Sequence, residues 1–282
     1  GFVYAKAPND NPGITFRGIG TQASHLGLDS SIGMFLDGAF MGHQRLTNIT
    51  QFDVERIEFI KGSQTTLLGK NVSLGAISIV STKPGDEFAG RIKVGTEVEN
   101  GGYLVDGAVD VPVNDRLKLR FAARYSDMDG WMKNVTTGHE GPADEDLGVR
   151  VTALYDFTDT TSASLSYQYT DNERIGSAVQ ITDPGLSALG LGAGPPLGES
   201  DFDDNNALFT SAPGSKNGEG FHDLETQLVN LTINTEFAGH EVTSITSYGG
   251  FDQFIVDDFD FDNKDTSYFS YDEQFWQISE EL

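Results

Sequence analysis

Cysteine is absent from the 282 residues, which excludes disulfide scaffolds, cysteine-ligated zinc and thiol catalysis. Basic residues are few: 18 Lys and Arg stand against 43 Asp and Glu, so the formal net charge is −25. This charge argues against a nucleic-acid partner, because phosphate binding needs a surplus of Lys and Arg. Long hydrophobic runs are also missing. A membrane-spanning helix needs about 18 or more consecutive apolar residues, and no such run occurs.

Turn-forming and aromatic residues are abundant instead. The sequence holds 33 Gly, 19 Phe and 9 Tyr, a composition typical of β-strands joined by many turns. From Phe88 onward, apolar and polar residues alternate, as in residues 117–126, 149–157 and 162–170. A period of two predicts strands with one apolar and one polar face. Soluble sandwiches and membrane barrels both have such strands, so the alternation alone does not decide between them.

The connections between the predicted strands favour a barrel. Short turns at 114–115, 158–160 and 238–239 alternate with long excursions at 129–146, 173–224 and 257–272. Outer-membrane barrels have short turns at one end and long loops at the other, an arrangement that a sandwich does not require. The strands are also about ten residues or longer, as a tilted membrane-spanning strand needs. We expect strands at about 88–98, 103–113, 117–128, 147–157, 161–172, 225–237, 240–256 and from 273 onward.

Aromatic side chains lie toward the strand ends on the apolar face. Outer-membrane barrels carry aromatic girdles at these two levels, where the rings meet the lipid headgroups. Cross-strand packing explains each single ring equally well, but their joint placement favours a membrane protein. The residues are Tyr125, Tyr155, Phe157, Tyr167, Tyr169, Phe237 and Tyr248.

The first 86 residues follow a different pattern. Glycine-containing turns at 18–20 and 37–38 are mixed with compact apolar runs at 54–60 and 76–80, and Lys83-Pro84-Gly85 forms a closing turn. We therefore predict a small mixed α/β domain over residues 1–86, followed by barrel strands over residues 87–282.

Several motifs of this first domain resemble the plug domain of TonB-dependent outer-membrane receptors in order and spacing. They are Ile14-Thr15-Phe16-Arg17-Gly18-Ile19-Gly20, Met34-Phe35-Leu36-Asp37-Gly38, the run from Val54 to Gln64, Leu68-Gly69-Lys70-Asn71 and the run from Gly75 to Val80. Ser63, Leu68 and Leu74 depart from the residues usual in the family at their positions. The resemblance implies a plug domain followed by antiparallel transmembrane strands, an incomplete part of a barrel of about 22 strands.

The resemblance also implies a function. Receptors of this family import scarce solutes across the outer membrane of Gram-negative bacteria, surrounded by outer-membrane lipid. The solute binds above the plug, and the energy-coupling protein TonB pulls on the plug. No bond in the solute is broken, so the resemblance implies a transporter and not an enzyme. The short docking box for TonB does not occur in this sequence.

A ferric siderophore is the expected cargo from the resemblance, and a vitamin, haem or an oligosaccharide are alternatives within the family. A passive porin is a further class, but porins do not require the plug-like sequence at 54–83. A cell-surface β-rich binding protein is the alternative of a different kind.

Two loops of the first domain are the predicted ligand site. In known receptors of the family, the loops after the Arg-Gly and Asp-Gly motifs face the ligand, and aromatic and cationic side chains suit an anionic, ring-bearing chelate. An ion pair for Arg17 and simple packing for Phe40 are the alternatives. The candidates are Arg17, His25, Phe40, Met41, His43 and Arg45. A second set, predicted to join plug and barrel through buried ion pairs, consists of Glu55, Arg56 and Glu58.

Acidic residues gather in two of the long excursions, and their oxygens could bind Ca²⁺. However, the segment from residue 258 lacks the Gly and Glu that a calcium loop needs at its sixth and twelfth positions, so a solvated loop is the simpler interpretation. The five His residues are not at metal-ligand spacing, and we predict no resident cofactor. The acidic residues are Glu199, Asp201, Asp203 and Asp204, then Asp257, Asp258, Asp260, Asp262 and Asp265.

Overall fold

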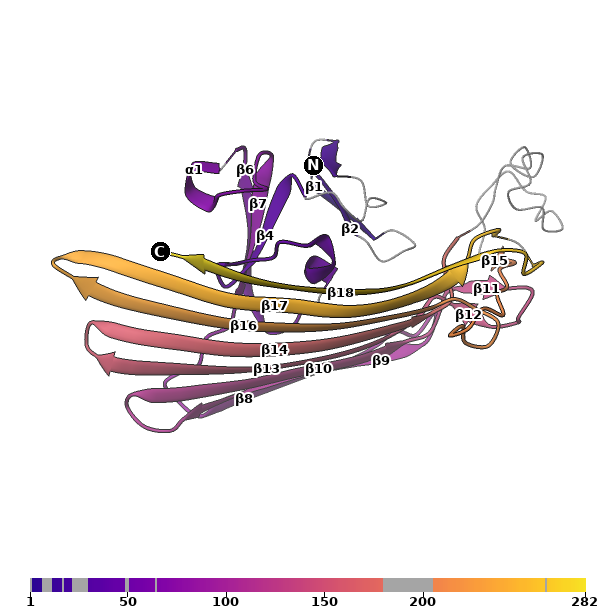
Figure 1. The fold of residues 1–282 in the computed structure, drawn as a ribbon. Helices are drawn as coiled ribbons and strands as arrows, with labels where there is room; N and C mark the ends of the chain where they lie inside the picture. Colours follow the sequence, from indigo (N-terminus) through magenta and orange to yellow (C-terminus); the bar gives the residue numbers. More distant parts are fainter. Residues whose placement is uncertain are drawn as a thin grey trace.

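A computed structural model shows one large curved sheet with a smaller N-terminal domain on its concave side (Figure 1). The structure describes residues 2–6, 12–16, 18–21, 30–48, 51–63, 65–179, 205–261 and 263–282. Among these residues no helix has the length and apolar character that crossing a membrane requires.

The large sheet has eight antiparallel strands in the order β18-β17-β16-β14-β13-β10-β9-β8. Each strand lies beside the next strand of the sheet along the chain, and the long connections all lie at one end of the sheet (Figure 1). This is the up-and-down arrangement predicted from the sequence. The strands are β8 (Ala89–Thr96), β9 (Gly102–Pro112), β10 (Leu117–Met128), β13 (Ala143–Thr158), β14 (Thr161–Ile175), β16 (Phe221–Phe237), β17 (His240–Asp258) and β18 (Tyr268–Glu281).

The two faces of the sheet differ as the alternation predicts. Phe121, Val151 and Tyr167 are direct cross-strand neighbours on the convex face, and they are 42%, 40% and 42% exposed. Thr152 and Gln168 on the concave face are buried although they are polar. No described element covers the convex apolar face, so the sheet does not form one half of a sandwich with a dry interior.

The N-terminal domain contains two small sheets. One has the order β5-β4-β7-β6, with β4 and β7 parallel, and the other has the order β1-β2-β3. The elements are β1 (Phe2–Lys6), β2 (Pro12–Phe16), β3 (Ile19–Thr21), β4 (Ile32–Leu36), β5 (Ala39–Phe40), the 3₁₀-helix η1 (Gln44–Asn48), β6 (Val54–Lys61), α1 (Thr65–Leu68) and β7 (Gly75–Ser81).

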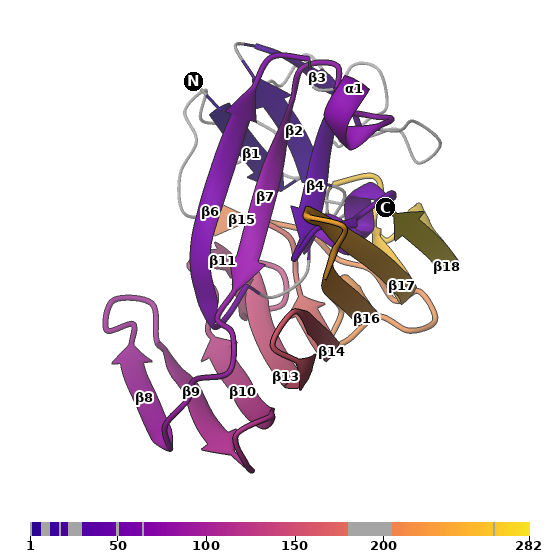
Figure 2. The ribbon, with the colours of Figure 1, turned by 90° about the vertical axis from the view of Figure 1, so that its left-hand side faces the viewer.

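The core of this domain is continuous with the large sheet. Ile32 and Ile77 are buried in the same cluster as Leu224 of β16 and Phe251 of β17. Viewed along the strands, β6 and β7 reach down to β9, β10 and β13 (Figure 2). The N-terminal domain therefore fills the concave side. Residues 82–88 connect the end of β7 to the start of β8.

A third small sheet lies at the end of the large sheet that carries the long connections. It has the order β12-β11-β15 and joins two of the long excursions. Its strands are β11 (Met132–Asn134), β12 (Glu140–Gly141) and β15 (Asn205–Asn206).

Candidate functional site

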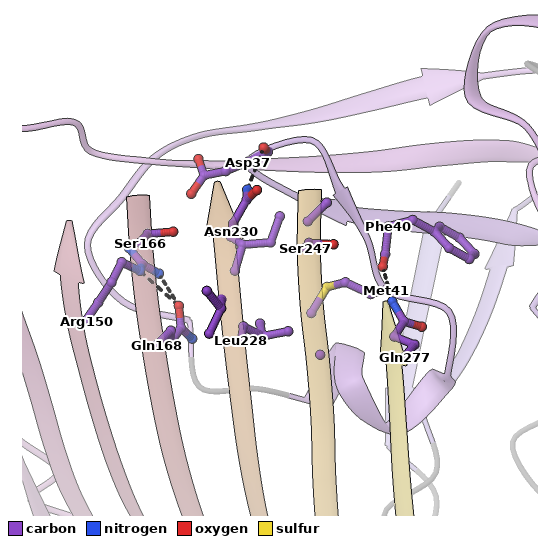
Figure 3. A pocket seen from close by; sticks show the side chains of 14 residues that line it. Asp37, Phe40, Met41, Arg150, Ser166, Gln168, Leu228, Asn230, Ser247 and Gln277 are labelled. Carbon is purple, nitrogen blue, oxygen red and sulfur yellow. Dashed lines mark hydrogen bonds between the residues drawn. The ribbon is translucent and has the colours of Figure 1, made fainter. Parts of the chain in front are cut away.

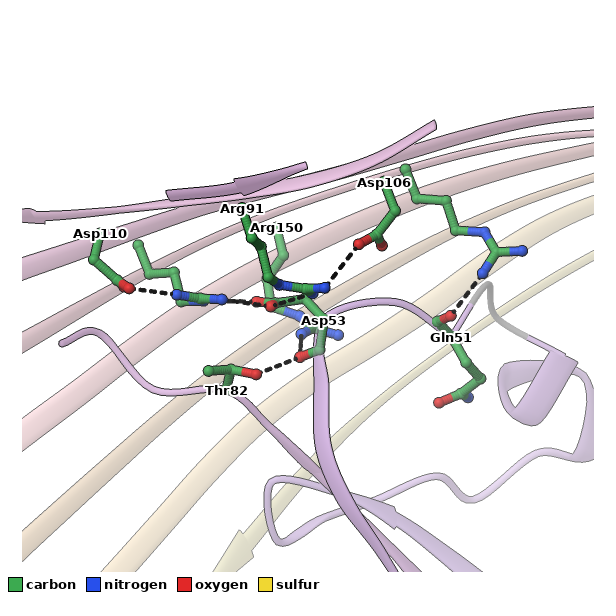
Figure 4. Close-up of polar contacts among 9 residues, drawn as sticks. Gln51, Asp53, Thr82, Arg91, Asp106, Asp110 and Arg150 are labelled. Atoms are coloured by element: carbon green, nitrogen blue, oxygen red, sulfur yellow. Dashed lines mark hydrogen bonds and ion pairs between the residues drawn. The ribbon is translucent and has the colours of Figure 1, made fainter. Parts of the chain in front are cut away.

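Asp53 lies at the centre of an ionic cluster between the N-terminal domain and the large sheet (Figure 4). Its Oδ1 accepts hydrogen bonds from Arg91 Nη2 at 2.9 Å and from Arg120 Nη2 at 2.6 Å, and its Oδ2 accepts one from Arg120 Nε at 2.8 Å. The same guanidinium groups reach carboxylates of β9: Arg120 lies 2.6 Å from Asp110, and Arg91 lies 3.1 Å from Asp106. The buried carboxylate of Asp53 thus links the N-terminal domain to two strands of the sheet, β8 through Arg91 and β10 through Arg120.

The ionised state of Asp53 follows from these contacts. Burial alone would raise the pKa of this carboxyl, but the hydrogen bonds from Arg120 and Arg91 outweigh it, so the pKa lies below its usual 3.8. The backbone of Asp53 takes part as well. Its carbonyl accepts hydrogen bonds from the Thr82 amide at 3.0 Å and from Arg150 Nη1 at 3.3 Å. The start of β6 and the end of β7 are therefore fixed to the sheet at one point.

Phe52 packs beside this cluster against a glycine of the sheet. The ring is 3% exposed, and the Arg150 guanidinium lies 4.8 Å from its centroid. A Cβ built on Gly148 would lie only 2.6 Å from Phe52 Cε1. Glycine at this position of β13 leaves the space that the ring occupies.

The turn at residues 37–40 contacts the sheet through neutral amides (Figure 3). Asn230 Nδ2 donates to the Asp37 carbonyl at 3.0 Å. Gln277 donates to the Phe40 carbonyl and accepts from the Gly42 amide at 2.9 Å. A cavity of about 20 Å³ lies among these contacts, enough for about one water molecule.

Arg45 of η1 contacts β17 and β18 nearer the end that carries the long connections. Its Nε lies 2.7 Å from a Glu273 oxygen, and its Nη2 donates to the Tyr271 hydroxyl at 3.0 Å, while Nη1 donates to Gln253. The His43 ring lies near the same strands, with Nε2 at 3.6 Å from Glu273. Arg45 is fully buried.

The six predicted ligand residues fall into three groups. Arg17 and His25 lie outside the described residues. Phe40 and His43 are partly exposed, whereas Met41 and Arg45 are buried between the N-terminal domain and the sheet. Contact of any of them with a solute stays a prediction. In this structure Met41 and Arg45 present no surface to a solute.

The three residues of β6 that the sequence predicts to pair with the barrel form ion pairs with one another. Arg56 pairs with Glu55 at 3.0 Å and with Glu58 at 2.7 Å, and all three side chains are about half exposed. Their pairing with the barrel stays a prediction. Among the described residues, Asp53 and Arg45 make buried ion pairs between the domain and the sheet.

The predicted acidic residues lie partly outside the described part of the chain. Those outside it are Glu199, Asp201, Asp203, Asp204 and Asp262. Asp257, Asp258 and Asp260 are buried, and Asp265 accepts a hydrogen bond from the Ser211 amide at 3.0 Å. Within the described part of the chain, no group of three or more acidic, His or Cys side chains could hold a metal ion.

Residues 1–76 match a protein-family model described as "TonB-dependent Receptor Plug Domain". The N-terminal domain is a TonB-dependent receptor plug. The large sheet is part of the barrel that surrounds such a plug, and its concave polar face holds the plug through the contacts described above.

Solved receptors have the same fold. The ferric yersiniabactin uptake receptor FyuA from Yersinia pestis matches with a TM-score of 0.74 and 16% identity, over 92% of this chain and 38% of that one. The open form of the ferric-catecholate import receptor Fiu from E. coli K12 matches with a TM-score of 0.64 and 13% identity, over 99% and 40%. The pyoverdine receptor FpvA from Pseudomonas aeruginosa PAO1 gives 0.64 and 15%, over 91% and 34%. The chain therefore spans less than half the length of these receptors.

The sequence did not identify the residues that join plug and barrel. Arg120 and Asn230 lie on the polar face of predicted strands, which is the only signal that they point inward. Asp53 directly precedes the apolar run at 54–60 and carries no motif of its own. Their pairing depends on how the plug sits against the sheet, and a strand pattern does not encode that.

Proposed function

We propose that this chain is the plug and the first barrel strands of an outer-membrane transporter that imports a ferric siderophore with energy from TonB. The observation that carries the proposal is a sheet with an exposed apolar face outside and a polar face that binds a plug inside. Residues on the apolar face contact lipid, and the plug closes the path until TonB acts on it. The similarity to receptors for ferric siderophores supports this cargo.

The exposed apolar face disfavours the cell-surface binding protein. Exposed bands of this extent are unusual on soluble proteins, whereas a lipid bilayer covers them. A vitamin, haem or an oligosaccharide as cargo remain outcomes of the test.

The test uses a deletion strain that carries the full-length gene on a plasmid. We expect the protein in the outer-membrane fraction, and we expect iron-starved cells to take up radioactive iron from ferric siderophores only when both the gene and TonB are present. If the deletion strain without the plasmid takes up iron normally but no longer grows on a vitamin, haem or oligosaccharide source, the cargo is that compound and not a ferric siderophore. Recovery of the protein in the soluble fraction would refute the transporter.

A further inference from the structure

An open hollow interrupts the convex apolar face of the large sheet. It measures about 590 Å³ and lies over β9, β10 and β13. Two small outward-facing residues that line it, Gly107 and Ala123, are direct cross-strand neighbours. Larger apolar side chains surround this pair. They belong to Ile92, Val105, Val109, Phe121, Tyr125, Leu147, Val149 and Val151. The hollow therefore exists because two adjacent positions of the face lack a large side chain.

A polar rim borders the hollow toward the long connections. Tyr125 lines the hollow and lies near the end of β10 from which the connection at 129–142 departs. Its ring lies 5.9 Å from the ring of Tyr103, and its hydroxyl donates to Glu145 Oε1 at 2.8 Å. The apolar hollow thus ends at two tyrosine rings and a carboxylate, which is the level where lipid headgroups meet a barrel.

Glu145 belongs to a row of four carboxylates on the same outer face. The members occupy neighbouring strands from β10 to β16, and each is the direct cross-strand partner of the next: Asp127, Glu145, Glu173 and Asp223. Like charges directly opposite each other destabilise a sheet. Lys216 of a long connection lies 3.3 Å from Glu173 and compensates that part of the row. Within the described part of the chain, Asp127 and Glu145 form no ion pair with a basic side chain.

The strands around the hollow offer no compensating cation on their outer face. The outward-facing positions of β8, β9, β10, β13 and β14 hold no Lys, Arg or His. Basic residues of the same strands, such as Arg91, Arg120 and Arg150, point to the concave side and bind the plug. A cation for Asp127 and Glu145 therefore comes from outside these strands, and the neighbour of a barrel wall is lipid.

We propose that the hollow binds one acyl chain of a membrane lipid whose headgroup carries a primary ammonium. The chain fills the space over Gly107 and Ala123, where an empty hollow would lose van der Waals contacts. The ammonium donates to Glu145 and Asp127 at the rim. Charge complementarity selects this lipid, because the row repels the phosphate of an anionic lipid that has no amine. The inference goes beyond the proposed function and uses only its membrane setting, not its cargo.

The test measures lipid binding to the full-length receptor in detergent by native mass spectrometry, with a chelator present to remove divalent cations. Three probes share the same two myristoyl chains: phosphatidylethanolamine has a primary ammonium, phosphatidylcholine has a trimethylated one and phosphatidylglycerol has none. We expect the ethanolamine lipid to bind about fivefold more tightly than the choline lipid and about tenfold more tightly than the glycerol lipid. Equal binding of the three lipids, or a preference for the glycerol lipid with or without added Ca²⁺, overturns the inference.

Two substitutions examine the hollow and the row separately. Ala123→Leu fills the hollow, and we expect all three lipids to bind about fivefold more weakly. Ala163→Leu is the matched control, because Ala163 lies on the same outer face in β14 but does not line the hollow. Glu145→Gln keeps an acceptor for the Tyr125 hydroxyl but removes the charge, and we expect it to abolish the preference for the ethanolamine lipid. Glu236→Gln, at the opposite end of the sheet, should keep that preference.

The comparison of lipids on the wild-type receptor decides the proposal without any variant. Unchanged binding in Ala123→Leu, or an unchanged preference in Glu145→Gln, refutes the site even if the wild type prefers the ethanolamine lipid. These results are separate from those for import. A receptor that imports iron but binds the three lipids equally leaves the import function intact and refutes the lipid site, whereas lipid selection by a receptor without iron uptake supports the site and contradicts ferric import.

Discussion

At the scale of residues, the contact between plug and barrel depends on a few buried polar groups. Asp53 has two guanidinium partners, and each partner also contacts a carboxylate of β9. Such a cluster is stable only while every member is present, because a single buried charge without its partner is costly. The cluster therefore stabilises the plug–barrel contact, and removing the charge of one residue is enough to destabilise it.

Replacing Asp53 by Asn should loosen the plug. The amide keeps the size of the carboxylate but removes its charge, which leaves Asp110 as the carboxylate partner of Arg120 among the described residues. Removing one member of a buried ion pair costs about 3–5 kcal/mol. Because the Arg91 side chain is 47% exposed, we expect the lower end of that range. Faster trypsin cleavage of the plug in the detergent-solubilised full-length receptor, and a lower urea midpoint, would measure the loss.

Asp86→Asn provides the matched control for this prediction. Asp86 pairs with Lys118 at 2.5 Å, but its side chain is 83% exposed, and solvent screens an exposed ion pair so that it adds little to stability. We expect this variant to behave as the wild type. If the Asp53 variant resists trypsin equally long, the ionic cluster does not hold the plug.

The Asp53 contact also predicts a dependence on pH. Burial opposes the charged form, but hydrogen bonds from Arg120 and Arg91 lower the pKa of Asp53 below the unfolded value of 3.8. A depressed folded pKa stabilises fully above the unfolded value, and this stabilisation is lost as the pH falls through the folded pKa. The difference in urea midpoint between wild type and Asp53→Asn should stay constant from about pH 7 to about pH 5 and shrink below pH 3.8. A difference that vanishes by about pH 6 would assign it to another group.

At the scale of elements, β13 accepts the plug because one position on its inner face, Gly148, has no side chain. The Phe52 ring is held between the Gly148 backbone and the Arg150 guanidinium, so it has little room to move. Gly148→Ala would place a methyl group 2.6 Å from the ring and should destabilise the plug–barrel contact by about 1–3 kcal/mol.

Gly107→Ala in β9 tests whether any added methyl group in the sheet has the same effect. The nearest atom to its Cβ would be the Arg91 carbonyl oxygen at 3.5 Å, an ordinary contact. We expect the urea midpoint to fall for Gly148→Ala and to stay unchanged for Gly107→Ala. Equal midpoints for the two variants would mean that the Phe52 ring relaxes freely.

The strands could be predicted from the sequence, but their ends toward the long connections could not. The alternation predicts a strand from residue 225, whereas β16 begins at Phe221. Asp223 and Glu225 occupy positions on the face that is apolar further along the strand, so the pattern stops before the hydrogen-bonded ladder does. A strand that continues beyond the apolar band keeps its backbone pairing and loses its hydrophobic signal.

The same reason limits what the sequence says about the site. Alternation predicts that Arg120 and Asn230 face the polar side, but it does not name their partners. Arg120 binds Asp53 from 67 positions away, and Asn230 binds the Asp37 carbonyl from 193 positions away. Such pairs depend on the curvature of the sheet and on the position of the plug. Short-range patterns contain neither.

At the scale of the whole molecule, the distribution of polarity is the reverse of that in a soluble protein. The large sheet buries Arg, Gln and Thr against the plug and exposes Val, Leu and Tyr on its other face. In water such a surface would favour aggregation, whereas in a bilayer the lipid chains cover the exposed apolar face. The arrangement therefore predicts that a charged side chain on this face is costly in a membrane and tolerated in water.

Val151→Arg distinguishes these environments. Val151 lies in the middle of the apolar face, between Phe121 and Tyr167, and is 40% exposed. In a membrane barrel, Arg at this depth costs about 2–4 kcal/mol, and we expect less folded receptor in the outer membrane. Phe157→Arg, on the same face but at the end of β13, should cost about 0–1 kcal/mol because the side chain reaches the headgroups. A soluble sheet would tolerate both substitutions equally, since each side chain already faces water. Equal yields of the two variants would therefore place this face outside the lipid, and a selective loss of Val151→Arg would place it within.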